Sequence, residues 1–184
     1  DIDADQDGYT GEVAIELDVS RKTDTISFHA SEMDLKSVVL DGPDNSIPLD
    51  CVVGDKGLVT ARAPAPLKPG RYTLKIEFAR EVNRKGVGIY KTRHRGAAYV
   101  FSQFEPEHAR SAFPCWDAPE FKIKWRMTLK VPRGHLAVSN TQPRRVTTSD
   151  GSKTVRFMRT RPMPSYLLAV ATGPMEAVPV EGMS

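Results

Sequence analysis

Several features that would reveal a fold or an activity at once are scarce or missing in this 184-residue chain. Its two cysteines, Cys51 and Cys115, could form one bridge, but they form neither a CxxC pair nor a disulfide-dense framework, so we expect two reduced, semi-buried thiols. No apolar run approaches the length of a membrane span, and no signal-peptide pattern is present. The cellular compartment stays open, with a slight preference for the cytoplasm.

Local signatures of catalysis and metal binding are also missing. The four histidines are scattered, without an i, i+4 pair or H-E-x-x-H, and no G-x-S-x-G is found. The opening DIDADQDGYTGE is similar to a calcium loop, but one register puts Ala14 at position twelve and the other puts Gln6 at the glycine position. We therefore expect no metal in this chain and an acidic turn that leads into a strand.

The charge of the chain is mild, with a net +3 and a pI near 8.9, and the cations do not form one long block. This balance does not suggest nucleic-acid binding. The cluster KTRHR (91–95) could hold an anionic ligand, but a solvated hairpin tip is the favoured interpretation, and GVG (86–88) is interpreted as a flexible turn.

What the chain does have is alternation of apolar and polar residues, while no segment of ten or more residues holds a helical period. The clearest case is 71–79, and 121–131 is predicted to be the longest strand. APAPLKPG (63–70) is expected to form a rigid corner. The predicted strands cover 12–19, 25–30, 35–40, 47–53, 56–61, 71–79, 98–104, 121–131, 135–139, 153–158 and 166–172. About a dozen short strands predict an all-β, saddle-like sandwich or barrel.

One stretch, FSQFEPEHARSAFPCWDAP (101–119), breaks the alternation. Its prolines allow one short helical turn near 106–112 and little more. Gln103, Glu105 and Asp117 should then lie at a sheet margin, and Arg110 could pair with Asp117 to fix the corner. In one interpretation, which spacing alone favours, Glu105 caps the turn and Gln103 forms hydrogen bonds with the edge of a strand. In the other, Glu105 binds a ligand cation at a cleft.

The motif S-Q-F-E-P-x-x-A-R-x-A-F-P-C-W-D-A-P resembles the signature of the amino-terminal domain of aminopeptidase N-type zinc aminopeptidases, the gluzincins. GIYKTRHRGAAYVFSQ (88–103) and MPSYLLAVATGPMEAV (163–178) are similar to the hairpin before that motif and to the last strand of the domain. Ser102 stands where the family usually has Thr. Ala118 replaces its usual Glu, which removes a carboxylate from the corner.

The resemblance implies that residues 1–184 form a single amino-terminal β domain that closes one side of an active-site cleft. The following catalytic domain of the same polypeptide would be its partner and would carry the zinc, so this chain would hold no cofactor and be inactive alone. Glu105 would bind the α-ammonium of a peptide substrate and Gln103 would line the pocket for its first side chain, while Arg110, Pro114 and Asp117 form the structural corner. Neither nucleic acid nor membrane is an expected partner. The alternative is a non-catalytic β-sandwich interaction module or a zinc-less scaffold relative.

Overall fold

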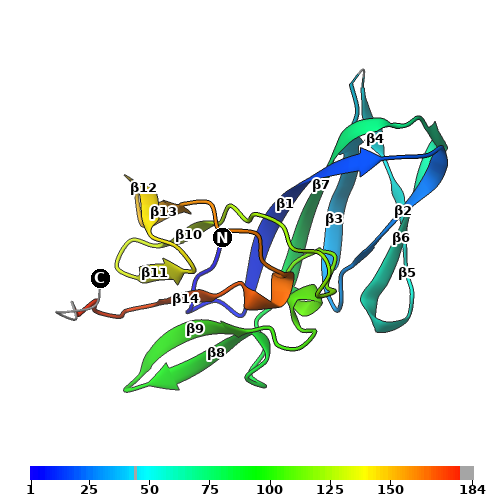
Figure 1. The fold of residues 1–184 in the computed structure, drawn as a ribbon. Helices are drawn as coiled ribbons and strands as arrows, with labels where there is room; N and C mark the ends of the chain where they lie inside the picture. Colours follow the sequence, from blue (N-terminus) through cyan, green and yellow to red (C-terminus); the bar gives the residue numbers. More distant parts are fainter. Residues whose placement is uncertain (44, 179–184) are drawn as a thin grey trace.

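The computed structural model describes residues 1–43 and 45–178, so the predicted domain end at residue 184 lies outside the described residues. Within this part, fourteen strands form four open sheets, and the helical structure is confined to three short 3₁₀ turns. Figure 1 shows two groups of sheets joined by the long strands β1 and β7. The all-β prediction is confirmed, and because the described sheets are open, the fold is a sandwich rather than a barrel.

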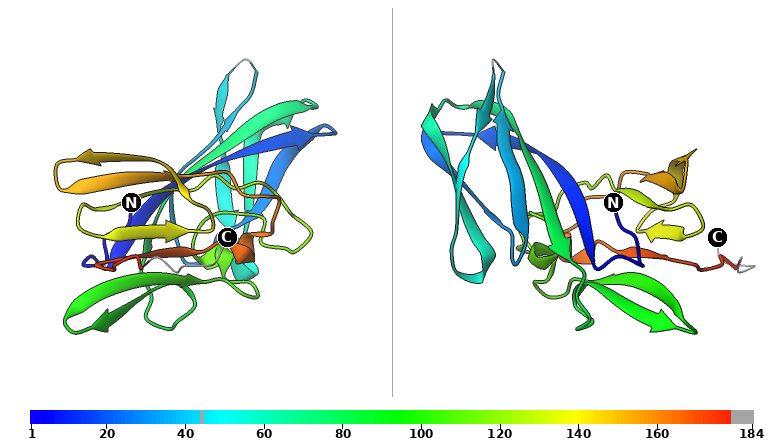
Figure 2. Two further views of the ribbon diagram at one scale, coloured as in Figure 1. Left: turned by 60° about the vertical axis from the view of Figure 1, so that its left-hand side comes forward. Right: turned by 180° about the vertical axis from the view of Figure 1, so that it is seen from behind.

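The first group holds residues from the amino-terminal half of the chain (Figure 2). One sheet has the order β1-β7-β3-β4 and the other the order β2-β6-β5, and η1 (Asp55–Gly57) precedes β6. Their bounds are β1 Gly8–Val19, β7 Gly70–Glu81, β3 Asp34–Asp41, β4 Ser46–Pro48, β2 Thr23–His29, β6 Leu58–Leu67 and β5 Asp50–Val53. Alternate apolar side chains of these strands, such as Phe28, Leu40 and Leu74, are fully buried in a shared core.

The second group holds the later strands. One sheet has the order β11-β14-β9-β8 and the other the order β10-β13-β12, with η2 (Ala109–Ser111) and η3 (Ser165–Leu167) beside them. Their bounds are β8 Gly88–His94, β9 Ala97–Gln103, β10 Thr128–Pro132, β11 Leu136–Ser139, β12 Pro143–Ser149, β13 Ser152–Phe157 and β14 Val170–Gly173. Side chains of both sheets, including Val100 and Phe157, fill a second core.

The strands β1 and β7 contribute to both cores, because each is twelve residues long. On β7, Leu74 and Ile76 lie in the first core and Phe78 lies in the second. Tyr9 of β1 packs edge-on against Phe78, with ring centroids 6.2 Å apart, and its hydroxyl donates to the carbonyl of Ala112 at 2.7 Å. The two halves are therefore held together by continuous strands.

Several sequence predictions are wrong in detail; for example, the predicted strand 166–172 begins in the turn η3, and β14 starts only at Val170. The predicted strand 47–53 is divided at buried Leu49 into β4 and β5, which belong to different sheets. The predicted corner 63–70 is strand as far as Leu67, the end of β6, since β5 pairs only as far as Arg62 and the exposed prolines beyond it need no partner there. The segment 121–131 enters a sheet only at Thr128, and Phe121 and Ile123 are each 43% exposed.

The interpretation of 86–95 is also corrected. β8 begins at Gly88, and Lys91 is buried because its ammonium donates to the carbonyl of Gln6 at 2.6 Å and to Asp7 at 2.9 Å. The hairpin tip is limited to Arg95 and Gly96, both with positive φ. At the chain's start, the acidic turn does lead into a strand, β1. None of the helices in the described ranges is long and apolar enough to cross a membrane.

Candidate functional site

The site predicted from the sequence lies where β9 ends. Phe104, directly after β9, is buried and packs edge-on against Phe113, which in turn packs against Trp125, each at 5.7 Å between ring centroids. Pro106 follows a cis peptide bond in a turn over residues 105–108, so it does not open the helical turn as expected. The helical turn itself, η2, falls within the predicted 106–112. A cluster of three aromatic side chains therefore anchors the segment 101–119, which we call the corner, to the second core.

The corner is held by the buried carboxylate of Asp117. Its Oδ2 accepts from the main-chain N and the Nε of Arg110 at 3.1 and 3.0 Å, and its Oδ1 accepts from the hydroxyl of Ser165 at 2.6 Å. The guanidinium of Arg110 also donates a hydrogen bond to the main-chain carbonyl of Asp117 at 2.9 Å. The side chain of Asp117 is 1% exposed and that of Arg110 is 14% exposed. The predicted pairing of Arg110 with Asp117 is confirmed. Buried Pro114 lies in the loop between these two residues.

A further contact comes from β2, which belongs to the first group of sheets. The main chains of His29 and Cys115 exchange hydrogen bonds of 2.8 and 3.0 Å, and the imidazole Nδ1 of His29 accepts from the N–H of Asp117 at 3.3 Å. Burial, and then the nearby Arg110 cation, lower the pKa of His29, which keeps it the neutral acceptor that this contact needs. Sequence reasoning missed His29 and Ser165, because neither lies near Asp117 along the chain.

Gln103 and Glu105 lie at the surface of this fixed corner. Both are exposed, and buried Phe104 between them points into the core, so the two polar side chains face away from it. Within the described residues, neither side chain forms a hydrogen bond or an ion pair; the nearby Glu107 instead contacts Arg110 at 3.8 Å. The turn η2 has no side-chain cap. The expected capping and edge-satisfying roles are therefore not seen in this structure.

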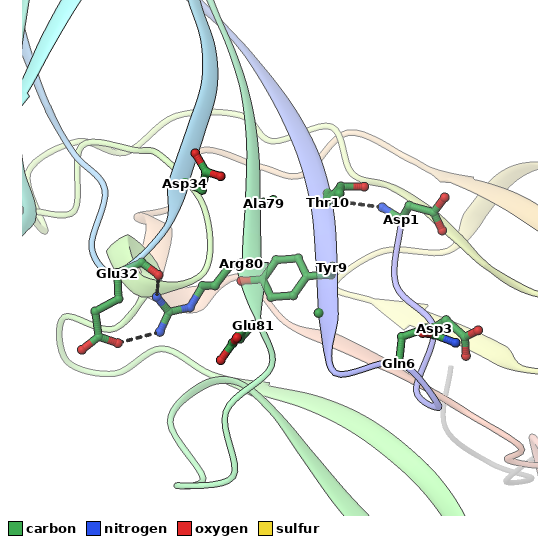
Figure 3. A pocket seen from close by; sticks show the side chains of 11 residues that line it. Asp1, Asp3, Gln6, Tyr9, Thr10, Glu32, Asp34, Ala79, Arg80 and Glu81 are labelled. Carbon is green, nitrogen blue, oxygen red and sulfur yellow. Dashed lines mark hydrogen bonds and ion pairs between the residues drawn. The ribbon is translucent and has the colours of Figure 1, made fainter.

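A second polar region lies between β1, β3 and β7, around a cavity of about 620 Å³ (Figure 3). Acidic side chains such as Asp3, Asp34 and Glu81 line it together with buried Arg80. The guanidinium donates to the carbonyl of Ser31 at 2.7 Å and to the carboxylate of Glu32 at 2.9 Å. This arginine thus fixes the turn before β3, and the cavity includes none of the site residues predicted from the sequence.

Both thiols are free, as the sequence predicted, and Cys51 is half-buried, but Cys115 is fully buried rather than semi-buried. Across residues 1–43 and 45–178, no three His, Cys, Asp or Glu side chains are grouped so that they could hold a metal ion. An accessible carboxylate and an accessible amide are presented together by a rigid support, and a cationic or hydrogen-bonding ligand could contact both.

Comparisons with known proteins identify the family to which the chain belongs. The family model of the peptidase M1 N-terminal domain matches residues 1–167. The chain is 31% identical to the puromycin-sensitive aminopeptidase of Caenorhabditis elegans, across 97% of the chain and 20% of that protein. It is 30% identical to aminopeptidase N of Acetobacter pasteurianus, across 96% of the chain and 51% of that protein, and 30% identical to aminopeptidase M1-A of Oryza sativa subsp. japonica, across 96% and 21%.

The chain thus spans between about a fifth and a half of the length of these relatives. The matched region includes the whole corner from Gln103 to Asp117, and it ends at Leu167, in the η3 turn that supplies Ser165. This chain belongs to the peptidase M1 N-terminal domain family.

Proposed function

We propose that this chain is the substrate-binding amino-terminal domain of a longer zinc-dependent aminopeptidase. Its partner is a following catalytic domain, which the greater length of the relatives supports. The observation that carries the proposal is the pair Gln103 and Glu105, whose polar groups are exposed and unengaged on a corner that Asp117 and Arg110 fix. A carboxylate without a partner among residues 1–43 and 45–178 is available to a ligand from outside them.

The bound group would be the terminal α-ammonium of a peptide. A charge-assisted hydrogen bond between this ammonium and Glu105 is stronger than a neutral hydrogen bond. An internal peptide bond offers no such cation, so the contact selects the chain end. Gln103, two residues earlier and on the same outward side, would contact the first side chain of the substrate. The carboxylate and the amide thus bind and orient the substrate without taking part in bond cleavage.

Hydrolysis would depend on the catalytic domain. When bound there, zinc supplies the Lewis-acid chemistry of peptide hydrolysis. Since the described residues of this chain bring no ligand set together, zinc has no expected site here. We therefore expect this chain alone to leave aminoacyl fluorogenic substrates intact, with or without added zinc.

The test replaces Glu105 by alanine in the complete polypeptide. Losing a charge-assisted hydrogen bond costs about 1.5–3 kcal/mol, so kcat/KM for an aminoacyl-aminomethylcoumarin should fall about 10- to 150-fold. Glu107→Ala is the matched control, because this carboxylate is also exposed and lies two residues away but already contacts Arg110. Its kcat/KM should change less than about twofold, because its contact with Arg110 is long, at 3.8 Å, and the Glu107 side chain is 66% exposed.

A chemical comparison shows whether the lost energy comes from the ammonium. A competitive inhibitor with a free α-amine and its des-amino analogue are both measured against the parent and the Glu105→Ala protein. The parent should prefer the amine, and the variant should lose that preference. An amine preference that survives the substitution would refute the role of Glu105. A complete polypeptide without peptidase activity would instead favour a non-catalytic module.

A further inference from the structure

Residues 121–161 carry a concentrated positive charge that the proposed function does not use. They hold eleven of the 26 Lys and Arg residues of the chain and one of its 23 acidic residues. Among the described residues, only Lys130 of these eleven forms an ion pair, with Asp1 at 2.9 Å. Elsewhere in the described chain, seven cations pair with carboxylates. The charge of 121–161 is thus left unbalanced.

Part of this charge stands on the outer face of the sheet β10-β13-β12. Arg156 of β13 lies directly opposite Arg145 of β12, and both are exposed. The neighbouring Val155 and Phe157 point to the other face and are buried in the second core. Like charges directly opposite each other across two strands are destabilising. The fold therefore keeps two arginines side by side at a cost that nothing within the described chain offsets.

The same sheet has an open edge at β12. Among the described residues, this strand pairs only with β13 and lies at the margin of the fold (Figure 1). All seven of its residues are exposed. Val146 lies opposite buried Val155, but Val146 itself is 53% exposed. The backbone N–H and C=O groups on the free side of an edge strand are available to another strand. The edge thus combines free backbone groups, an uncovered apolar side chain and unpaired arginines.

We propose that the β12 edge binds an acidic, extended segment of another polypeptide, which adds to the sheet as a further strand. Backbone hydrogen bonds along the edge supply affinity, as in other cases of strand addition. Acidic side chains at alternate positions of the segment lie beside Arg145 on the outer side of the sheet, and Arg156 lies one strand further on, across β12. The apolar side chains between them cover Val146 on the inner side. The ligand is therefore a strand that alternates acidic and apolar residues.

Other occupants fit these observations less well. A second copy of β12 would place arginine against arginine, which repels. The outward-facing residues of the three strands include no aromatic side chain on which the bases of a single-stranded nucleic acid could stack. Lipid headgroups neither pair with a strand edge nor cover Val146. A polypeptide of opposite charge uses all three features of the edge.

This surface is separate from the proposed substrate site. Gln103 lies on the outer face of the sheet β11-β14-β9-β8, and the second core lies between that sheet and the sheet that carries β12. The proposal therefore does not rest on the role of Glu105. Substitutions on β12 and β13 can be tested without touching the residues assigned to substrate binding.

The experiment uses the complete polypeptide and a fluorescein-labelled peptide with blocked ends, which alternates Glu and Val over seven residues, the length of β12. Binding is followed by fluorescence anisotropy at low ionic strength, where charge pairs are least screened. Arg145→Gln with Arg156→Gln should weaken binding about two- to fivefold, because the cross-strand charge pair with Arg145 is lost together with the longer-range attraction of Arg156. Arg62→Gln with Arg71→Gln removes the same charge from other exposed strand positions and should leave binding unchanged.

Strand addition is separated from simple charge attraction by a peptide of the same sequence with alternate backbone nitrogens methylated. It should bind at least about tenfold more weakly if its backbone pairs with the edge. Equal binding of the methylated peptide, or equal binding by the Arg145→Gln/Arg156→Gln protein, overturns the proposal. It is also overturned if an oligonucleotide or phosphatidylserine vesicles bind this face more tightly than the peptide. Circular dichroism of each variant verifies that the sheets remain folded.

Discussion

Replacing Asp117 by alanine should cause a large loss of stability, because this carboxylate connects three separate segments. It accepts two hydrogen bonds from Arg110 and one from Ser165, and its side chain is 1% exposed. Without it, the guanidinium of Arg110 stays largely covered without its counter-ion, and the Ser165 hydroxyl loses its acceptor. The damage therefore comes mainly from the partners left behind.

The expected size of the effect follows from that burial. Breaking a buried ion pair by removing one partner costs about 3–5 kcal/mol. For a chain of this length, each kcal/mol shifts the melting temperature by about 2–4 °C, so a decrease of about 6–20 °C is expected. Asp24→Ala is the matched control. Its pair with Arg62, at 3.2 Å, is exposed on both sides, so its loss should cost less than about 1 kcal/mol.

The assay is urea unfolding followed by circular dichroism and tryptophan fluorescence. Trp116 lies next to Asp117 and packs near Phe28, with ring centroids 6.4 Å apart, so its emission should report the corner directly. If circular dichroism and tryptophan fluorescence give the same transition, the free energy of unfolding can be calculated with a two-state model. A loss below about 1 kcal/mol for Asp117→Ala, equal to that of Asp24→Ala, would refute the view that this buried network supports the corner.

Two further predictions concern titratable groups. Because burial lowers the pKa of His29, the unfolded chain binds more protons than the folded chain just below pH 6.5. The free energy of unfolding should therefore fall as the pH drops through this range. Urea titrations at several pH values should show a weaker pH dependence for His29→Gln. Burial raises the pKa of both thiols, most strongly that of Cys115, so native protein should react slowly with iodoacetamide at Cys51 and react at Cys115 only after unfolding, as mass spectrometry would show.

The parts of the fold that the sequence predicted depend on neighbours along the chain. Alternation in 71–79 places Leu74, Ile76 and Phe78 in the core and Lys75 outside, as observed on β7. The alternation of apolar and polar residues, however, does not predict at which residue a strand begins or stops pairing with its neighbours. The alternation of 121–131 continues through Phe121 and Ile123, yet the sheet begins only at Thr128, because the partners available to a strand are set by the whole fold.

The same distinction explains the site. Arg110 and Asp117 lie seven residues apart around a proline-bounded turn, so their pairing was predictable from the sequence. The contacts of Asp117 with His29 and Ser165 span 88 and 48 residues and left no local signal. Lys91 is a similar case, because its burial depends on an acceptor at Asp7, 84 residues away. Pairings that depend on topology appear only when the sheets are assembled.

These long-range contacts bear on the proposed role of Glu105. His29 comes from β2, whose neighbours fill the first core, whereas Ser165 comes from η3 beside the second. The corner that carries Glu105 is therefore fixed by both halves of the molecule, through Asp117. Measuring one residue from the end of a substrate requires a carboxylate whose position does not drift. A loop tied to only one sheet would follow the motions of that sheet, whereas a loop tied to both can hold Glu105 at a constant distance from a cleft formed with another domain.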